Sequence, residues 1–109
     1  MVKFRQLFSF QQKEIDAAFK NSKPKGSIAG LKLLISQPSS KPQHGKLLII
    51  TPKASGKANQ RNLLRRRIKS IYYEEKLYTK PIIAILLVYK EAPKLSFEEL
   101  KNFLSKNLK

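Results

Sequence analysis

Residues 53–69 limit the possible folds of this chain more than any other segment, because they carry seven Lys or Arg side chains and no acid. The apolar run Leu47–Ile50 precedes them, and Pro52 ends that run since proline cannot donate to a sheet ladder. A helical apolar pattern lies within and beyond the basic segment. The pattern therefore predicts a strand, a turn that contains Gly56, and an amphipathic helix.

The predicted helix has one apolar face and one cationic face. Its apolar side chains fall at i, i+4, i+7 and i+8: Leu64, Ile68, Ile71 and Tyr72. Its cationic side chains fall at i, i+4 and i+8 on another face, with Asn62 and Arg66 beside them: Arg61, Arg65 and Lys69. Because a cationic helix face binds phosphate groups, we expect a nucleic-acid partner.

The other segments predict an α+β domain. Ser9 and Gln12 fit a capping box, so a helix is expected from about Phe10 to Lys20. Strands are expected at residues 27–36, 46–51 and 82–89, loops at 21–26 and 37–45, and a turn at 91–94. A second capping box, from Ser96 to Glu99, predicts a final helix that ends near Leu108.

The order of these elements predicts one domain, residues 1–109, built on a single mixed sheet. We expect helix, two or three strands, helix, strand and helix, an α-β-β-β-α-β-α sandwich with helices packed on the sheet. The strand, basic helix and strand should form a crossover that pairs two strands in parallel. The run 82–89 is the most hydrophobic segment and the expected central strand, and the unbroken run 46–51 suggests that both its faces are covered.

The net charge of +16 also favours a polyanionic partner, because charge repulsion opposes folding unless it is neutralised. The chain has no Cys and one His, and its seven acids form no convincing cluster, so neither a catalytic nor a metal site is expected in the protein. No apolar run reaches the ~18 residues of a membrane span, and no signal peptide is evident. These observations favour a cytoplasmic protein without a membrane partner.

The segment from Pro52 to Asn62 resembles the strand-to-helix signature of the bacterial ribonuclease P protein component, Ser-Lys-Lys-x-Gly-x-Ala-x-x-Arg-Asn-Arg. The matching positions are Lys53, Gly56, Ala58, Arg61 and Asn62. Residues 14–19 are similar to that family's first-helix pattern, acid-Phe-x-x-Val-Phe, and the last strand and helix stand where the family has them. Three positions depart from the pattern: Ile15 replaces the first aromatic, Pro52 a small hydroxylic residue, and Leu63 the last Arg, near which Arg65 or Arg67 could supply the charge.

The resemblance implies a fold detail and a function. It implies a left-handed crossover, although right-handed connections are the general rule. It also implies that the chain is the non-catalytic protein subunit of ribonuclease P, a ribonucleoprotein endonuclease (a hydrolase) of tRNA processing. The RNA subunit would cut the 5′ leader from precursor tRNA with Mg2+ held mainly by the RNA. The protein would bind ribonuclease P RNA in a 1:1 complex, together with the precursor tRNA.

Two RNA-binding surfaces are therefore expected. The first, for the RNA subunit, comprises the strand-to-helix turn and the basic helix: Lys53, Gly56, Lys57, Arg61, Asn62, Arg65, Arg66 and Lys69. The second, implied by the resemblance, is a cleft between the first helix and the sheet for the single-stranded leader: Ile15, Phe19 and Lys32, with Phe8 and Phe10 as further contributors. Two structural alternatives stay open, namely that Gly56 only provides a positive-φ turn and that Phe19 is a core residue.

A ribosomal or ribosome-assembly RNA-binding protein is the alternative function, since it would share the size, the charge and the fold class. A stand-alone nuclease is disfavoured by the missing catalytic cluster. A membrane-binding protein is disfavoured because the basic helix lacks an apolar face rich in Trp or Phe.

Overall fold

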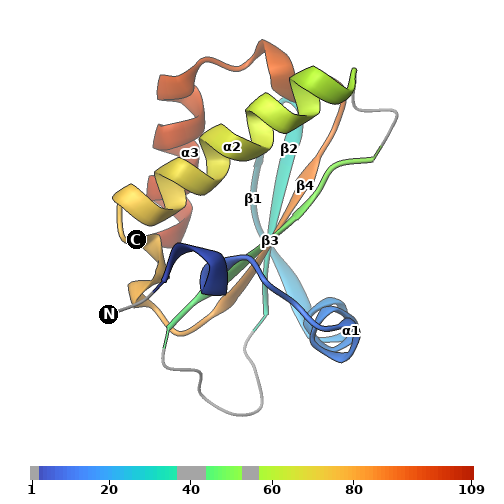
Figure 1. Cartoon of the computed structure of the whole chain (residues 1–109), viewed down its shortest axis with the longest axis vertical. Helices are drawn as coiled ribbons and strands as arrows, with labels where there is room; N and C mark the ends of the chain where they lie inside the picture. The colour runs from blue at the N-terminus through green and yellow to red at the C-terminus, as the bar shows by residue number, and fades with distance from the viewer. Residues whose placement is uncertain (1–2, 37–43, 53–56) are drawn as a thin grey trace.

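The computed structural model describes residues 3–36, 44–52 and 57–109. In these ranges the α-helices are α1 (Gln12–Lys20), α2 (Ala58–Glu74) and α3 (Phe97–Leu108), and the strands are β1 (Ser22–Ile28), β2 (Leu31–Ser36), β3 (Lys46–Ile50) and β4 (Ile83–Val88). Short 3-10 helices are η1 (Phe4–Leu7), η3 (Leu77–Thr79) and η4 (Ala92–Lys94). The order of helices and strands is the predicted α-β-β-β-α-β-α (Figure 1).

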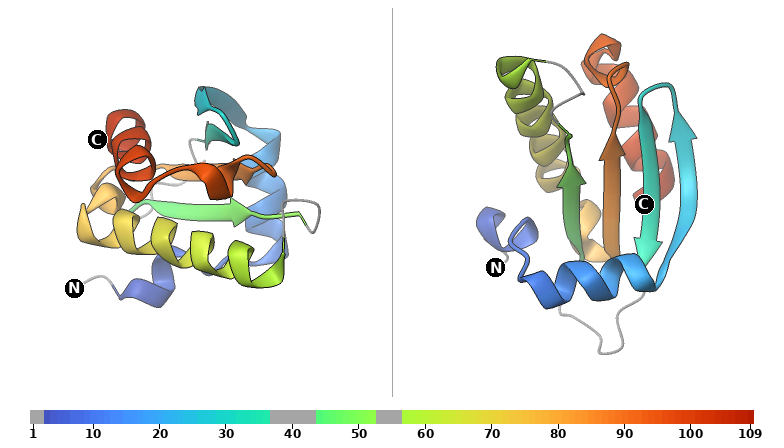
Figure 2. Two further views of the ribbon diagram at one scale, coloured as in Figure 1. Left: turned by 90° about the horizontal axis from the view of Figure 1, so that it is seen from above. Right: turned by 90° about the vertical axis from the view of Figure 1, so that its right-hand side faces the viewer.

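One four-stranded mixed sheet, in the order β1-β2-β4-β3, runs through the molecule. Strand β2 pairs antiparallel with β1 and β4, whereas β3 pairs parallel with β4, so α2 forms the predicted crossover. With α2 and α3 behind the sheet and β3 pointing up, β4 lies to the right of β3, which makes the crossover left-handed (Figure 2, right). Strand β4, the most hydrophobic segment, is a central strand as predicted.

The hydrophobic core lies between the sheet and the helices α2 and α3, which cover the same face (Figures 1 and 2). The predicted apolar stripe of α2 is buried there: Leu64, Ile68, Ile71 and Tyr72. The third helix contributes Leu100, Phe103, Leu104 and Leu108. Helix α1 instead crosses the opposite face near one end of the sheet (Figure 2). Since α2 is held by its apolar side, its other sides carry the cationic residues.

The first helix begins later than predicted. Its N-cap is Gln11, and the capping box joins Gln11 to Glu14, so the predicted box of Ser9 and Gln12 is wrong. Ser9 instead belongs to the preceding turn, because its Oγ donates to the carbonyl oxygen of Arg5 at 2.9 Å. The Ser9 hydroxyl group therefore bonds to the η1 turn and does not cap α1.

Residues 22–26 belong to strand β1 and not to the predicted loop, which is a second correction. Pro24 and Gly26 are tolerated there because β1 is an edge strand, and the register shifts between these two residues. Gly30, whose φ is +90°, then turns the chain into β2. The predicted strand at 27–36 is therefore two strands of a hairpin.

Strand β3 is an edge strand, and the expectation that both its faces are covered is wrong for the face opposite α2 and α3. Leu47 is buried in the core, whereas Leu48, Ile49 and Ile50 are only half-buried. Leu48 and Ile50 lie on the sheet face opposite α2 and α3, and α1 reaches only one end of that face (Figure 2). A half-exposed apolar surface consequently lies beside α1.

Candidate nucleic-acid interface

The predicted cationic row lies on the side of α2 that faces strand β3. Arg61, Arg65 and Lys69 are half-buried, whereas Asn62 and Arg66 beside them are exposed. Residues four positions apart on a helix are neighbours on its surface, so the three side chains form one ridge. The structure thus gathers on a single helix the groups that the sequence predicted to act together.

Arg65 is anchored to the end of β3. Its Nη2 donates to Thr51 Oγ1 at 2.6 Å. The two residues border a pocket of about 290 Å3 that is lined by Phe8, Leu47, Leu48, Ile49, Thr51, Arg65 and Lys69. The Nζ of Lys69 lies 5.3 Å from the centre of the Phe8 ring, so the structure places Phe8 on the α2 side of β3. No role had been predicted for Thr51, because 14 residues separate it from Arg65.

The same pocket adjoins an aromatic cluster at the C-terminal part of α2. Phe8 packs edge-on against Tyr72, with ring centres 5.7 Å apart. Burial raises the pKa of the Tyr72 phenol, so the group stays neutral at physiological pH. The cluster therefore holds η1 in place next to Lys69 without adding charge to the surface.

The cationic row is not neutralised by carboxylates of the described residues. Within residues 3–36, 44–52 and 57–109, ion pairs join Lys46 to Glu14 and Lys109 to Glu75, and neither pair includes a member of the row. The first turn of α2 carries no acid, and Lys57 at its N-cap is exposed. The positive end of the helix dipole therefore adds to the positive charge of the row.

Six of the eight residues predicted for this first surface lie on α2 or at its N-cap: Lys57, Arg61, Asn62, Arg65, Arg66 and Lys69. Lys53 and Gly56 lie outside the described residues. The alternative that Gly56 serves only a turn lies outside them as well.

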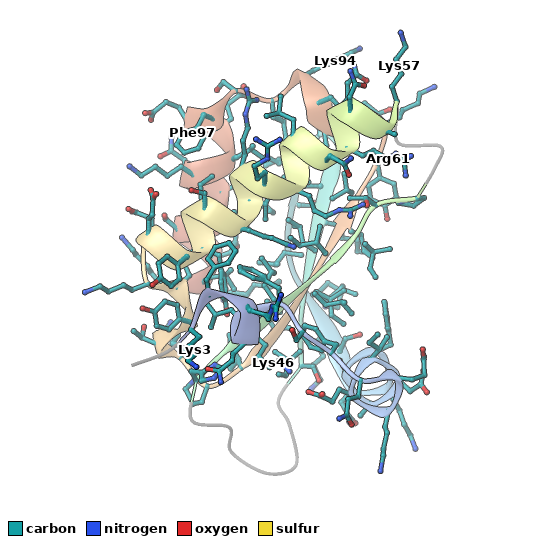
Figure 3. All side chains as sticks on the ribbon, viewed as in Figure 1. Lys3, Lys46, Lys57, Arg61, Lys94 and Phe97 are labelled. Atoms are coloured by element: carbon teal, nitrogen blue, oxygen red, sulfur yellow. The ribbon has the colours of Figure 1, made fainter. Side chains whose placement is uncertain are left out.

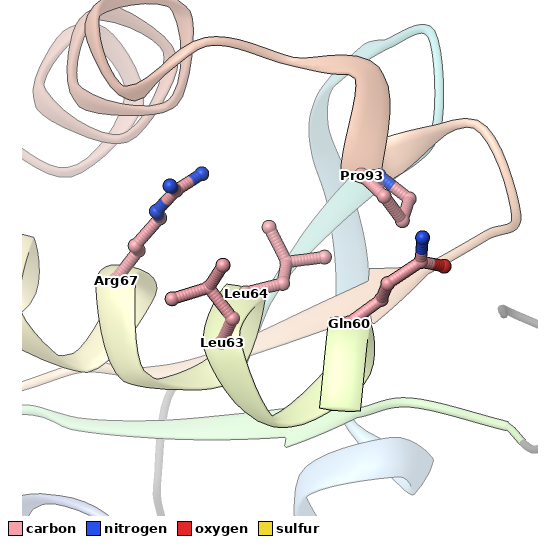
Figure 4. A pocket seen from close by; sticks show the side chains of 5 residues that line it. All are labelled: Gln60, Leu63, Leu64, Arg67 and Pro93. Atoms are coloured by element: carbon pink, nitrogen blue, oxygen red, sulfur yellow. The ribbon is translucent and has the colours of Figure 1, made fainter. Parts of the chain in front are cut away.

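Leu63, at the position where the signature has its last Arg, borders a second pocket (Figure 4). This pocket has a volume of about 210 Å3 and is lined by Gln60, Leu63, Leu64, Arg67 and Pro93. Leu63 is 42% exposed, and Arg67 stands about one helical turn further along the same face. Of the two Arg residues that could replace the missing charge, Arg67 lies beside Leu63, whereas Arg65 lies on the β3 side.

The second predicted surface lies where α1 crosses the sheet. Phe19 is 41% exposed, so it is not a core residue, and Ile15 is half-buried. Half-buried apolar side chains surround the buried Ile85 on the same sheet face: Leu34, Leu48, Ile50 and Leu87. We call these five residues the apolar floor. Apolar surfaces and exposed aromatic rings are the features that unpaired bases stack on.

Lys32 lies on the same sheet face but not beside Phe19. Strand β1 follows α1 directly and pairs Ser22 with Ser36, so α1 lies at the Ser36 end of β2. Lys32 is four residues away along that strand, a separation of about 13 Å. The structure therefore places the exposed Lys32 at the end of the apolar floor that is opposite α1.

Lys46, the first residue of β3, is labelled in Figure 3 and connects this sheet face to α1 through Glu14. Its Nζ lies 2.8 Å from Glu14 Oε2 and 4.4 Å from the centre of the Phe10 ring. The hydrogen bond from Lys46, and after it the one from the backbone N–H of Gln11, lowers the pKa of the Glu14 carboxyl. Sequence reasoning missed this pair because 32 residues separate its members.

Among the described residues, no three His, Asp or Glu side chains gather as ligands for a metal ion. None of the described helices combines the length and the hydrophobicity that a membrane crossing requires.

The family model described as Ribonuclease P matches residues 4–109 of the chain. The ribonuclease P protein component of Onion yellows phytoplasma (strain OY-M) is 30% identical over 94 residues, which make up 85% of this chain. The chain spans 65% of the length of that curated relative.

Two solved structures show the same fold. The RNase P protein of Staphylococcus aureus superimposes with a TM-score of 0.78 at 17% identity, covering 94% of this chain and 92% of that one. The RNase P protein of Thermotoga maritima superimposes with a TM-score of 0.71 at 19% identity, covering 91% of this chain and 96% of that one. The mixed α+β fold is thus common to all three chains.

Proposed function

The chain belongs to the ribonuclease P protein family, and from this membership we propose that it is the protein subunit of ribonuclease P, which supports the 5′ maturation of tRNA. In this proposal the RNA subunit performs the cleavage with Mg2+ held mainly by the RNA. The protein binds that RNA in a 1:1 complex in the cytoplasm. The described residues gather no ligand cluster that fits Mg2+, and the protein's side chains are assigned to RNA binding. Family membership disfavours the ribosomal alternative.

The cationic surface of α2 is the observation that carries this proposal. Arg61, Arg65 and Lys69 form one row on this helix, and their charged groups are not paired with described carboxylates. Arg can bridge two phosphate oxygens with its planar group, and Asn62 can hydrogen-bond a base edge or a 2′-hydroxyl. RNA phosphates on this surface would also relieve the repulsion within a chain of net charge +16.

The single-stranded leader, in the same proposal, lies along the apolar floor beside α1. Phe19 stacks on one base, and Lys32 meets a phosphate further along the strand. The exposure of both side chains and the half-burial of the floor support this assignment. Single strands bind proteins through cationic side chains and aromatic stacking.

Reconstitution tests the proposal. Adding the chain to a bacterial ribonuclease P RNA at low magnesium should increase the rate of 5′ cleavage of precursor tRNA, because cationic side chains then screen phosphates that few metal ions screen. An unrelated basic protein at the same concentration controls for non-specific charge neutralisation. No stimulation would contradict the proposed function, and cleavage by the chain without RNA would place the chemistry in the protein.

Replacing Phe19 with alanine should weaken the binding of leader-bearing precursor tRNA by about 5- to 150-fold, since a stacked base contributes about 1–3 kcal/mol. The fold should persist because Phe19 is 41% exposed. Mature tRNA, which lacks the leader, should bind as before when both affinities are measured with the protein–RNA complex. Phe97 on α3 is 43% exposed and provides the matched control, so Phe97→Ala should change neither affinity. Equal losses of affinity for precursor and mature tRNA would argue against a contact between Phe19 and the leader.

Replacing Leu63 with arginine should strengthen binding to the RNA subunit by roughly 2- to 5-fold, because an exposed charge pair contributes up to about 1 kcal/mol. The slope of log K against log salt should steepen by about 0.7–0.9 if the new side chain meets a phosphate. Phe97→Arg adds the same charge on α3 and should change neither quantity. An unchanged slope for Leu63→Arg would show that no phosphate is within reach of this position.

A further inference from the structure

Helix α1 is held to the rest of the molecule by few apolar contacts. Among its nine residues only Ala18 is buried, and Ile15 is half-buried. A helix of this length is not stable alone in water. Its C-terminal end is fixed by the chain itself, because Asn21 joins α1 directly to β1. Its N-terminal end therefore needs another attachment to keep its place over the sheet.

Glu14 provides that attachment with both of its carboxylate oxygens. Oε1 accepts the backbone N–H of Gln11 at 3.1 Å, which completes the capping box, and Oε2 accepts Lys46 Nζ at 2.8 Å. Lys46 is itself held in place, since its side chain is only 16% exposed and its Nζ lies 4.4 Å from the centre of the Phe10 ring. One carboxylate thus joins the start of α1 to the first residue of β3.

We propose that Lys46, Glu14 and Phe10 form a clamp that sets the position of α1 over the sheet, and that Glu14 and Lys46 are positioning residues for leader binding. This inference rests on the proposed function, in which α1 carries Phe19 to the border of the apolar floor. Lys46 alternates with Leu47 along β3, so it lies on the same sheet face as that floor. Without the clamp, α1 can turn about its junction with β1, and Phe19 leaves its place.

If Glu14 affected RNA binding only through its charge, the substitution Glu14→Gln would have the opposite effect on RNA affinity from the one that the clamp predicts. Glu14→Gln removes an acid from a chain of net charge +16, so non-specific attraction alone would tighten RNA binding. Glutamine can still complete the capping box, but it cannot form an ion pair with Lys46. If the clamp positions α1, Glu14→Gln weakens leader binding although the protein becomes more positive.

Hydrogen exchange of the free, full-length chain measures the clamp without RNA. Glu14→Gln should raise the amide exchange rates of α1 by about 5-fold or more and leave those of α3 unchanged, since only the local opening of α1 becomes easier. Glu91→Gln removes the same charge from an exposed residue of the β4–α3 connection and should leave α1 unchanged. If the amides of α1 exchange at the same rates in Glu14→Gln as in the wild type, the clamp is wrong, whatever the RNA-binding results are.

The affinity of the protein–RNA complex for precursor and mature tRNA measures the consequence. Glu14→Gln should lower the affinity for leader-bearing precursor by about 5- to 20-fold and that for mature tRNA by less than about twofold. A Glu14→Gln/Lys46→Gln double variant should lose no more affinity for the precursor than whichever single variant, Glu14→Gln or Lys46→Gln, binds it more weakly. The reason is that the effects of substituting two partners of one ion pair are not additive. Equal or tighter precursor binding by Glu14→Gln would overturn the positioning role. If the wild type binds precursor and mature tRNA with equal affinity, both the proposed leader cleft and the positioning role are wrong. The hydrogen-exchange rates of α1 still test the clamp in that case.

Discussion

Replacing Arg61 and Arg65 together with alanine is expected to lower the affinity for ribonuclease P RNA by about 100-fold or more. Each guanidinium group that contacts a phosphate contributes about 1.5–3 kcal/mol as a charged hydrogen-bond donor. Both side chains belong to one row on α2, and neither is paired with a described carboxylate. Their loss therefore removes two adjacent contacts from the centre of the proposed interface.

A salt titration separates lost phosphate contacts from structural damage. The slope of log K against log salt should become shallower by about 0.7–0.9 for each contact that is lost. Thermal unfolding should still show one cooperative transition, lowered by a few degrees because the 2.6 Å hydrogen bond from Arg65 to Thr51 disappears. A double variant without a melting transition would show that the two Arg residues are structural.

Lys101 and Lys106 on α3 provide a control with the same change in net charge. Alanine at both positions should lower the affinity for the RNA by less than about threefold, since charges outside an interface contribute little to binding. A loss as large as that of the Arg61 and Arg65 variant would mean that total charge, and not the row on α2, governs binding.

Replacing Gly30 with alanine is expected to destabilise the domain by about 2–5 kcal/mol and to lower Tm by about 10–25 °C. Gly30 has a φ of +90°, which L-residues rarely adopt. A Cβ atom there would overlap the backbone N of Ala92 and lie 2.7 Å from its Cα. Because both neighbours are backbone atoms of η4, the hairpin would have to move away from the β4–α3 connection.

Gly26→Ala in the same hairpin is the matched control. A Cβ atom at Gly26 would lie 2.6 Å from Asn107 Oδ1, but that atom is the far end of a side chain and can turn aside. Thermal unfolding should therefore show a change of at most about 1 kcal/mol for this variant. Equal losses of stability for Gly30→Ala and Gly26→Ala would show that the close approach of Gly30 to η4 does not cause the destabilisation.

Much of the first surface could be predicted because its determinants are local. The spacing of Leu64, Ile68 and Ile71 decides which side of α2 is buried, and this leaves Arg61 and Arg65 on another side. The apolar content of residues 82–89 similarly predicted the central position of β4, since such a strand is buried best between two other strands.

Predictions from local sequence patterns were wrong where a residue makes a different contact from the one that its residue type suggests. Ser9 fits a helix N-cap, but its hydroxyl bonds to Arg5 in the preceding turn. Pro24 and Gly26 are typical of a loop, but an edge strand tolerates both residues. A short window of sequence does not contain the strand order that makes β1 an edge.

The sequence by itself determined the order of elements, the match to the family signature and the cationic face of α2, because spacing along one helix and charge do not depend on distant residues. Only the tertiary structure decided that β3 is an edge strand beside Arg65, that Phe19 stays exposed, and that Lys46 meets Glu14 across 32 residues. The physical reason is that contacts between distant segments depend on strand order and on which face each helix covers. Both follow from burying the apolar surface of the whole chain at once.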